Sequence, residues 1–399
     1  MAGVADKARF FLEKSVPQLR EWERKDIFNQ DEIRNIVSKR NDFEHRVLSP
    51  GNVPADWSAY AKWEQSLETL RVKRCQRLKI RHLASGHAGQ GRVLSIYDRG
   101  TKRHASSAWL WKEYLQYTAK VKASKRFRRV MTEALRMMPN EVELWTMAGR
   151  RSAHNGDMAS ARSFFMRGCR FCTRDATLWL EYARCEMDWL AKVDRRKADK
   201  PQNDPLKPDQ SNGADDELRI EDSDEESDLD EEGRLLPQPS KEQAKVIDKP
   251  AAKQLQNNPA MDGEIPMAIF DISKKQSFFG PEAAAQFFLI VASYRSVSAQ
   301  PKVSQHILSH MDNHYASHPA TADCHVRQPI LGLRANTVEF VQNLREVLAR
   351  LDKYLAIVDD KAGLASKTVA WIDDFLADAE LDEALRQVLE HTQQKMQAL

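Results

Sequence analysis

The sequence contains few cysteines and no long hydrophobic run. Its 399 residues include five cysteines, an odd and sparse set that is typical of a reducing compartment and argues against a disulfide-rich secreted fold. No stretch of about 18 uncharged apolar residues occurs, so we expect no membrane span and no membrane partner. The first residues carry charges through their apolar stretch, and they are therefore not expected to be a secretory signal.

Catalytic motifs are also missing. The sequence has no Gly-x-Ser-x-Gly, no Walker A motif and no His-Glu-x-x-His. The glycine-rich stretch SGHAGQGR (85–92) lacks the Gly-Lys-Ser/Thr ending of a phosphate loop, and we interpret it as a turn between helices. We therefore predict a protein that is not an enzyme, with no cofactor and no small-molecule substrate.

Two patterns suggest metal ligands but favour a structural interpretation. Cys169 and Cys172 have metal-ligand spacing, yet no second pair exists to complete a zinc site, so packing on a helix face is the preferred interpretation. Four histidines at successive i, i+4 steps would share a face if one helix carried them all, and two of them could bridge a metal. No acidic or cysteine ligand accompanies them, which favours a polar helix face for His306, His310, His314 and His318.

Charge is divided unevenly along the chain. Basic residues predominate in residues 1–200 and acidic residues in the remainder, which hints at a polyanion near the first half. The stretch KVKASKRFRR (120–129) is the most basic segment. It would contact RNA phosphates, act as a nuclear-localisation patch, or form a solvated turn, and the sequence gives these alternatives equal weight. The basic residues concerned are Lys120, Lys122, Lys125, Arg126, Arg128 and Arg129.

Residues 193–260 form a polar and acidic segment. Twelve acidic residues and one arginine fall between Asp215 and Glu232, a composition that cannot bury enough apolar surface to fold. We predict a disordered acidic insertion. Ser223 and Ser227 lie in a setting that acidophilic kinases prefer, although an unmodified solubilising loop is an equal alternative. In a third alternative, the acidic segment mimics nucleic acid and folds back onto the basic first half of the chain.

A tryptophan motif recurs at Trp111, Trp145 and Trp179, which stand 34 residues apart, an interval that we call the repeat period; an earlier copy at Trp57 stands 54 residues before Trp111. Each copy begins an amphipathic helical pattern. Aromatic residues follow at spacings of three in the copies at Trp57 and Trp111. The copy at Trp179 has Tyr182 and then Cys185, whereas the copy at Trp145 has Ala148 and Arg151.

Small residues recur with the same period at Gly100, Ala134 and Gly168, where we expect helices to approach closely. A fixed period with two helices per unit predicts a helix–turn–helix solenoid, in which the repeated aromatics pack between helices. These aromatics are Trp57, Tyr60, Trp63, Trp111, Tyr114, Tyr117, Trp145, Trp179 and Tyr182.

The remaining segments also show helical patterns. Residues 3–25 and 28–49 have helical periodicity, and Asn29 with Glu32 forms a capping-box pattern at the start of the second. An apolar stripe from Val338 to Leu355 indicates a C-terminal helix. The expected organisation is N-terminal helices (1–50), a repeat array (51–192), a disordered acidic linker (193–260), further repeat-like helices (261–320) and C-terminal helices (330–399).

The motif Trp-x-x-Tyr-x-x-aromatic-Glu resembles the half-a-TPR (HAT) repeat. This resemblance implies an all-α, helical-hairpin solenoid of HAT repeats. The stretch DEIRNIVSKRNDFEHRVL (31–48) resembles the U-three small nucleolar RNA-associated protein six family. That resemblance implies a nucleolar, non-catalytic scaffold in the UtpB subcomplex of the small-subunit processome, needed for pre-18S rRNA processing. The implied partners are WD-repeat subunits of UtpB, other processome proteins, U-three snoRNA and pre-rRNA.

Two alternatives to this function remain open at the level of sequence. The basic first half could form a direct RNA-binding module that reads the backbone of pre-rRNA or snoRNA. The chain could also be a HAT-repeat scaffold of another RNA-processing complex, such as the spliceosome or the mRNA 3′-end cleavage machinery.

Overall fold

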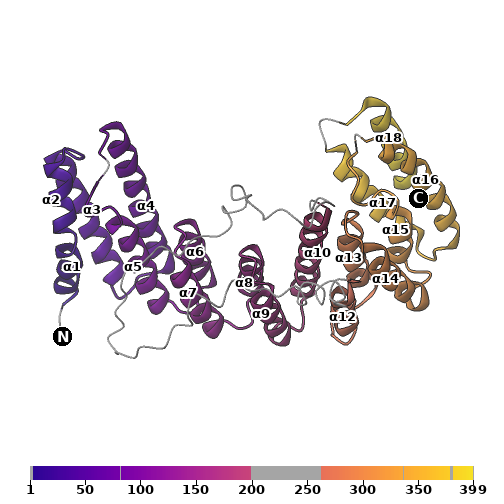
Figure 1. The fold of residues 1–399 in the computed structure, drawn as a ribbon, viewed down its shortest axis with the longest axis horizontal. Helices are drawn as coiled ribbons and strands as arrows, with labels where there is room; N and C mark the ends of the chain where they lie inside the picture. The colour runs from indigo at the N-terminus through magenta and orange to yellow at the C-terminus, as the bar shows by residue number, and fades with distance from the viewer. Residues whose placement is uncertain (1–2, 81, 199–261, 336, 378–380, 399) are drawn as a thin grey trace, which may run out of the picture. The chain divides into compact units, whose positions relative to one another are not determined.

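All the residues that the structure describes belong to helices or to the segments that connect them. The structure is a computed structural model, and it describes residues 3–80, 82–198, 262–335, 337–377 and 381–398, among which no β-strand occurs. Ser223, Ser227 and the acidic segment from residue 199 onward lie outside these ranges. Within them, Figure 1 shows the helices α1 (Val4–Glu13), α2 (Val16–Arg24), α3 (Gln30–Leu48), α4 (Pro54–Arg77), α5 (Ala88–Arg103), α6 (Ala108–Lys120), α7 (Ser124–Met137), α8 (Val142–His154), α9 (Met158–Phe171), α10 (Thr177–Ala198), α12 (Glu264–Ser273), α13 (Pro281–Ala292), α14 (Gln300–His314), α15 (Pro319–Arg327), α16 (Val338–Ile357), α17 (Lys361–Leu376) and α18 (Glu383–Gln397).

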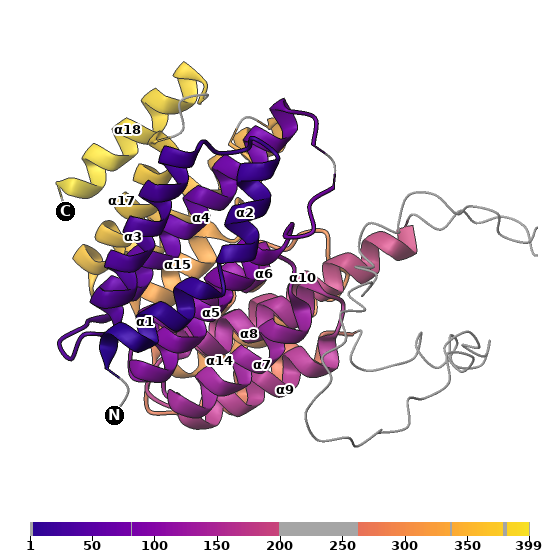
Figure 2. The same ribbon diagram turned by 90° about the vertical axis from the view of Figure 1, so that its left-hand side faces the viewer.

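The chain divides into two compact units. The first unit is Met1–Trp145 and the second is Thr146–Leu399. In the first unit α1 packs against α3, which in turn packs against α4, and the chain continues through the successive contacts α4–α5, α5–α6 and α6–α7 (Figure 2). The N-terminal helices are thus part of the same compact unit as the first copies of the repeat.

The N-terminal region contains two short helices where the sequence pattern predicts one. The predicted helix over residues 3–25 is interrupted after Glu13, and α2 begins at Val16. Pro17 lies in the first turn of α2, where its missing N–H needs no helical partner, and this explains why a new helix begins there. The capping box at α3 is confirmed, because the backbone N–H of Asn29 donates to the Glu32 carboxylate at 2.9 Å.

The helix boundaries reproduce the repeat period. Helices α6 and α8 begin and end one repeat period apart, and α7 and α9 do the same. The close approach expected at Gly100 is also present, since a Cβ there would lie 3.1 Å from the Trp57 side chain. Ala134 is buried at the equivalent position of α7. The repeated spacing therefore corresponds to repeated helix pairs.

The glycine-rich stretch is only partly a turn. Helix α5 begins at Ala88, so Gly89 and Gly91 lie inside its first turns, which corrects the prediction that all of 85–92 connects two helices. Gly89 is placed against the Glu68 side chain, and a Cβ at this position would lie 2.2 Å from the carboxylate. Close packing against α4, and not phosphate binding, accounts for this glycine.

In the second unit, the helices on either side of residues 199–261 pack against each other. Helix α10 continues to Ala198, beyond residue 193 where the acidic segment is predicted to begin, and it packs against α12 and α13. The Tyr294 hydroxyl donates to Asp188 of α10 at 2.7 Å, and the Ser298 N–H donates to Asp194 at 2.8 Å. The helical packing thus resumes directly on α10 after this segment.

The C-terminal helices share a core of buried side chains. Phe340, Leu344 and Val347 of α16 pack with Trp371 and Leu364 of α17. The predicted apolar stripe on α16 is therefore largely core. Its first two members are an exception, because Val338 and Val341 are exposed.

Candidate interaction surfaces

Each complete copy of the repeat contains a stacked pair of aromatic rings. An aromatic residue stands at a constant spacing before the repeat tyrosine and stacks on it. The ring centroids are 5.0 to 5.6 Å apart and the interplanar angles are 4° to 16° for Phe43–Tyr60, Tyr97–Tyr114 and Phe165–Tyr182. Burial raises the pKa of all three tyrosines, so their hydroxyl groups remain neutral at physiological pH.

The repeat tryptophans are buried and anchor the segment that precedes their helix. Trp111 donates from its indole nitrogen to the Ala105 carbonyl at 2.9 Å, and Trp145 donates to the Pro139 carbonyl at 2.7 Å. Both acceptors stand at the same spacing before their tryptophan. Trp57 uses the Asn52 side chain instead, at 3.0 Å. The Trp179 indole nitrogen has no hydrogen-bond partner among the described residues, and the equivalent carbonyl, on Thr173, accepts from Ser277.

Two repeats also share an ion pair with a buried glutamate at the same register. Glu64, which follows Trp63, accepts two hydrogen bonds from Arg40 at 2.7 and 3.0 Å. Glu186, which stands at the equivalent position, accepts two from Arg162 at 2.7 and 2.8 Å. In each pair the arginine lies 24 residues before the glutamate. Such forked pairing fixes the relative orientation of two helices.

The other repeat copies replace this ion pair. In the copy that begins at Trp111, Leu94 and Thr118 occupy the two positions, both are buried, and the Thr118 hydroxyl donates to the Leu115 carbonyl at 2.8 Å. The copy at Trp145 has buried Ala148 where the others have tyrosine, so it has no ring to stack at that position. The sequence motif thus identifies the helix pairs, whereas the polar contacts vary between them.

The sequence motif does not include the residues that pair with the repeat tyrosines and glutamates. Phe43, Tyr97 and Phe165 stand at a constant spacing before the repeat tyrosines, so a signal for them is present in the sequence. Arg40 and Arg162 likewise stand at a constant spacing before the glutamates. The predicted packing aromatics are all buried except Trp63, which is partly exposed and whose ring centroid lies 5.5 Å from that of Phe43.

The candidate metal ligands do not assemble. Burial raises the pKa of the Cys169 thiol to about 12, which disfavours the thiolate that a metal requires. Helix α14 ends at His314, so His318 leaves the predicted face and instead accepts a hydrogen bond from the Ala320 N–H at the start of α15. His306 pairs with Asp271 at 2.9 Å. Among the described residues no group of three His, Cys, Asp or Glu side chains is arranged to hold a metal.

The basic segment 120–129 connects α6 to α7 and places all six cations in solvent. Phe127 is turned inward and buried, while Lys122 adopts a positive φ of 62° in the turn. Arg126 donates to the Tyr114 hydroxyl at 2.9 Å, and Arg129 lies 3.4 Å from Glu133. We call the set Lys120, Lys122, Lys125, Arg126, Arg128 and Arg129 the α7 basic surface.

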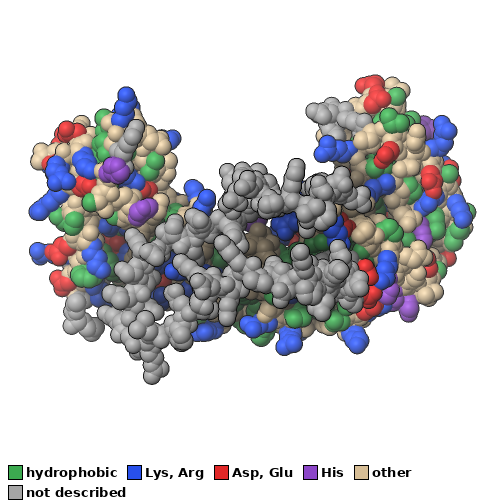
Figure 3. Space-filling model, viewed as in Figure 1, with side chains coloured by type: hydrophobic (Ala, Val, Ile, Leu, Met, Phe, Trp, Pro, Cys, Tyr) green, Lys and Arg blue, Asp and Glu red, His purple; other side chains and the backbone are tan. Residues whose placement is uncertain are grey.

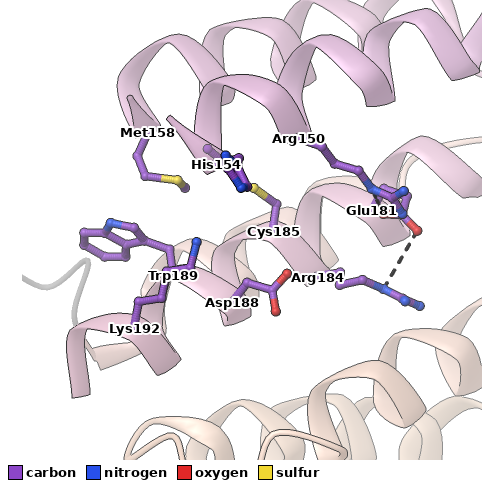
Figure 4. Close-up of a pocket in the computed structure, with 10 residues that line it drawn as sticks. Arg150, His154, Met158, Glu181, Arg184, Cys185, Asp188, Trp189 and Lys192 are labelled. Atoms are coloured by element: carbon purple, nitrogen blue, oxygen red, sulfur yellow. Dashed lines mark hydrogen bonds and ion pairs between the residues drawn. The ribbon is translucent and has the colours of Figure 1, made fainter. Parts of the chain in front are cut away.

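An open pocket of about 260 Å³ lies between α8 and α10. In Figure 4, Arg150 and His154 point from α8 toward α10, and Trp189 with Met158 forms the apolar end. Glu181 accepts from Arg150 at 2.9 Å and lies 3.8 Å from Arg184. We call this the α8–α10 pocket. The repeat pattern does not predict its lining, which depends on which faces of two helices meet.

The charges of the α8–α10 pocket are only partly compensated. Glu181 is held by two arginines, and Asp188 accepts from Tyr294. Lys192 and Arg184 stand exposed at its rim. A cavity with one aromatic wall and charges of both signs suits an extended or helical segment of another protein better than a small apolar ligand.

The packed helices define the class: the described part of the chain is all-helical, and within it α6 and α7 recur as α8 and α9 one repeat period later. None of the helices in the described parts of the chain is both long and apolar enough to cross a membrane. A sequence model described as U3 small nucleolar RNA-associated protein 6 matches residues 12–95. This region contains the Arg40–Glu64 pair and the first stacked aromatic pair.

Individual relatives agree with that match. The chain is 33% identical over 193 residues to U3 small nucleolar RNA-associated protein 6 of Schizosaccharomyces pombe, a region that covers 48% of this chain and 40% of the relative. It is 25% and 26% identical to the mouse and human homologues, over 47% of this chain and 32% of each relative. The chain thus matches less than half the length of these relatives. Over these residues it is similar to the U3 small nucleolar RNA-associated protein 6 family.

Proposed function

We propose that this chain is a non-catalytic scaffold subunit of the small-subunit processome, within its UtpB subcomplex. It would support the U3 snoRNP-dependent processing of pre-18S rRNA and 40S ribosome biogenesis in the nucleolus. The observation that carries this proposal is the family match over residues 12–95, which lies on the part of the chain with the most elaborate buried polar packing. The relatives are described as associated with U3 small nucleolar RNA.

The architecture supports a scaffold made of HAT repeats. The Trp and Tyr residues of the motif pack inside the helix pairs, and the ion pairs at Glu64 and Glu186 repeat at one register. Repeats of this kind stack along one direction and present long helical surfaces to partners. The proposal assigns no catalytic step to the chain, and its partners are proteins, with WD-repeat subunits of UtpB as the expected ones.

We propose the α8–α10 pocket as one contact site for such a protein partner. Arg184 and Lys192 are exposed at its rim, whereas Trp189 supplies an apolar wall with Arg162 placed over its ring at 5.3 Å. Aromatic residues and arginine are the residue types that most often dominate the affinity of protein interfaces. Reversing the charges of Arg184 and Lys192 would therefore lower the affinity for the partner without removing any buried packing.

The test is affinity purification of the tagged chain with quantification of the recovered proteins. Wild type is expected to recover WD-repeat processome subunits, and the double variant Arg184→Glu, Lys192→Glu is expected to recover them less efficiently. The matched control is Arg345→Glu, Lys353→Glu, two exposed cations of α16 with no ion pair among the described residues. Recovery of splicing or 3′-end cleavage factors instead of processome proteins would contradict the proposed function. Equal losses in both variants would contradict the role of the pocket.

A further inference from the structure

We propose that the α7 basic surface binds the phosphate backbone of RNA directly. This inference deepens the proposed function and rests on it for the identity of the RNA, which a processome would supply as pre-rRNA or small nucleolar RNA. The binding itself is a property of this chain and can be measured without other subunits.

The cations of this surface are largely uncompensated. Among the described residues, Lys120, Lys122, Lys125 and Arg128 form no ion pair, and only Arg129 has a nearby carboxylate, on Glu133. Some other cations of the first unit are paired, for example Lys62 with Glu113 and Arg74 with Glu32. A cluster without carboxylate neighbours keeps its full positive potential for a ligand.

The side chains are arranged along one side of α7. Lys125, Arg128 and Arg129 stand at i, i+3 and i+4, and Arg136 continues the same exposed stripe toward the end of the helix. The opposite side carries Phe127, Val130, Met131 and Ala134, which are buried against the rest of the unit. Figure 3 shows Lys and Arg side chains among those at the surface of the molecule. The cations therefore form a continuous row.

Helix α7 retains this row although like charges disfavour it. Cations at i, i+3 and i+4 repel each other, and cations in the first turn oppose the helix dipole. The first turn of α7 contains no acidic residue, and no side chain caps it. A bound polyanion would remove both penalties at once, because it neutralises the row and faces the positive end of the helix.

The excess of basic over acidic residues is larger on the second helices of the pairs than on the first. Helices α5, α7 and α9 together carry twelve Lys or Arg and two Asp or Glu, whereas α4, α6, α8 and α10 carry fourteen and nine. In the second unit, α9 has no acidic residue, and exposed Phe171 stands beside Arg170 and near Arg167. Basic residues next to an exposed aromatic ring are typical of surfaces that bind single-stranded nucleic acid.

The surface suits a phosphate backbone better than a protein. Protein interfaces are usually centred on large side chains that become buried, and the only aromatic residue of this segment, Phe127, is already buried within the unit. Lysine and arginine side chains on long flexible stems contact phosphates without reading bases. We therefore expect binding that depends strongly on salt and little on sequence.

The experiment measures the affinity of the full chain for an unstructured oligouridylate by fluorescence anisotropy at salt concentrations between about 50 and 200 mM. The test variant is Lys120→Gln, Lys122→Gln, Lys125→Gln, Arg128→Gln. The control variant is Lys275→Gln, Arg345→Gln, Lys353→Gln, Lys361→Gln, which removes the same number of exposed cations, none of them in an ion pair among the described residues, from the second unit. Both variants have the same net charge, so any difference between them is local.

The expected result is a loss of affinity in the test variant only. Each phosphate contact with a single strand contributes about 0.7 to the slope of log affinity against log salt, so removing four contacts should make the slope shallower by about 3. Equal affinities of the two variants at every salt concentration would overturn the inference, as would the absence of binding by wild type. Loss of nuclear accumulation with unchanged RNA binding would also overturn it and assign the surface to import. The recovery of processome proteins by the test variant is measured in parallel. If the variant still recovers them, a failure of the RNA-binding inference leaves the proposed function intact.

Discussion

The two repeated arginine–glutamate pairs differ in how deeply their arginines are buried. Arg40 and Glu64 are both shielded from solvent, and the Arg92 guanidinium lies 4.0 Å from the same glutamate. In the second pair the Arg162 side chain keeps 27% of its exposure. A buried charge that loses its partner cannot regain water, whereas a partly exposed one can. The glutamate at this motif position should therefore contribute more to the free energy of unfolding in the first unit than in the second.

Removing the two glutamates tests this difference. We predict that Glu64→Ala lowers the free energy of unfolding by about 3–5 kcal/mol, because it leaves two guanidinium groups uncompensated. Glu186→Ala should cost about 1–2 kcal/mol, since Arg162 can be rehydrated. Urea unfolding followed by far-UV circular dichroism measures both. Equal losses, or a larger loss for Glu186→Ala, would contradict the assignment of Arg40 and Arg92 as the more deeply buried cations.

Two glutamates of the first unit, Glu21 and Glu32, make its stability depend on pH in the acidic range. Burial alone would raise the pKa of Glu21, but hydrogen bonds from the Ser85 hydroxyl, from the Ala84 and Ser85 amides and from Lys25 lower it to about 2. The paired Arg74 guanidinium, helped by the Asn29 amide, lowers the pKa of Glu32 to about 2 as well. Each carboxylate holds a segment distant in sequence, Glu21 the 84–85 turn and Glu32 the end of α4.

The sign of the pH dependence follows from these lowered pKa values. Both groups have folded-state pKa values below the ordinary 4.5, so their stabilisation is complete above that pH and is lost as pH falls toward about 2. We predict a falling Tm over this window for wild type and a flatter profile for Glu21→Gln, which starts from a lower Tm at neutral pH. Glu13→Gln, on the exposed face of α1, is the control. A Glu21→Gln profile as steep as that of wild type would contradict this account.

At the scale of the helices, close approach explains why some glycines are required. Gly149 of α8 faces the ring of Phe165 on α9, and a Cβ there would lie 2.4 Å from a ring carbon. Phe165 is itself stacked on Tyr182 of α10, so it cannot move without disturbing a second helix. Gly91 of α5 has open space around it. The two glycines share a helical setting and differ only in what they touch.

Alanine substitution should separate these two cases. Gly149→Ala should destabilise the protein by about 1–3 kcal/mol, because overpacking outweighs the gain in helix propensity. Gly91→Ala should stabilise it by about 0.5–1 kcal/mol, because only the propensity changes. Thermal unfolding of both variants beside wild type gives the comparison. A stabilising Gly149→Ala would show that α8 and α9 pack less closely than the structure indicates.

Local signals predict the helices well, whereas contacts between helices are harder to foresee. The Asn29–Glu32 cap and the repeat period can both be recognised from local sequence patterns, and both are present in the structure. The break between α1 and α2 escapes prediction because an apolar pattern runs through it. The α8–α10 pocket escapes prediction as well, since it requires knowing which faces of two helices meet when α9 separates them in the sequence.

At the scale of the whole chain, charge and packing are organised separately. The buried motif residues hold the helix pairs together, while the second helices α5, α7 and α9 carry few acidic residues beside their Lys and Arg side chains. Residues 199–261 contain all twelve acidic residues found between Asp215 and Glu232, yet the helices before and after this segment, α10 and α12, pack directly against each other. The acidic stretch thus enters the sequence between two neighbouring helices and not between two separate folds.

The most direct test of the proposed function is the RNA that accompanies the chain in cells. The tagged protein should be purified at low salt, and the co-purified small RNAs quantified against an untagged control. We predict strong enrichment of U3 small nucleolar RNA and of pre-18S precursors over spliceosomal small nuclear RNAs. Enrichment of spliceosomal RNAs, or equal recovery of all small RNAs, would contradict the assignment of this chain to the small-subunit processome.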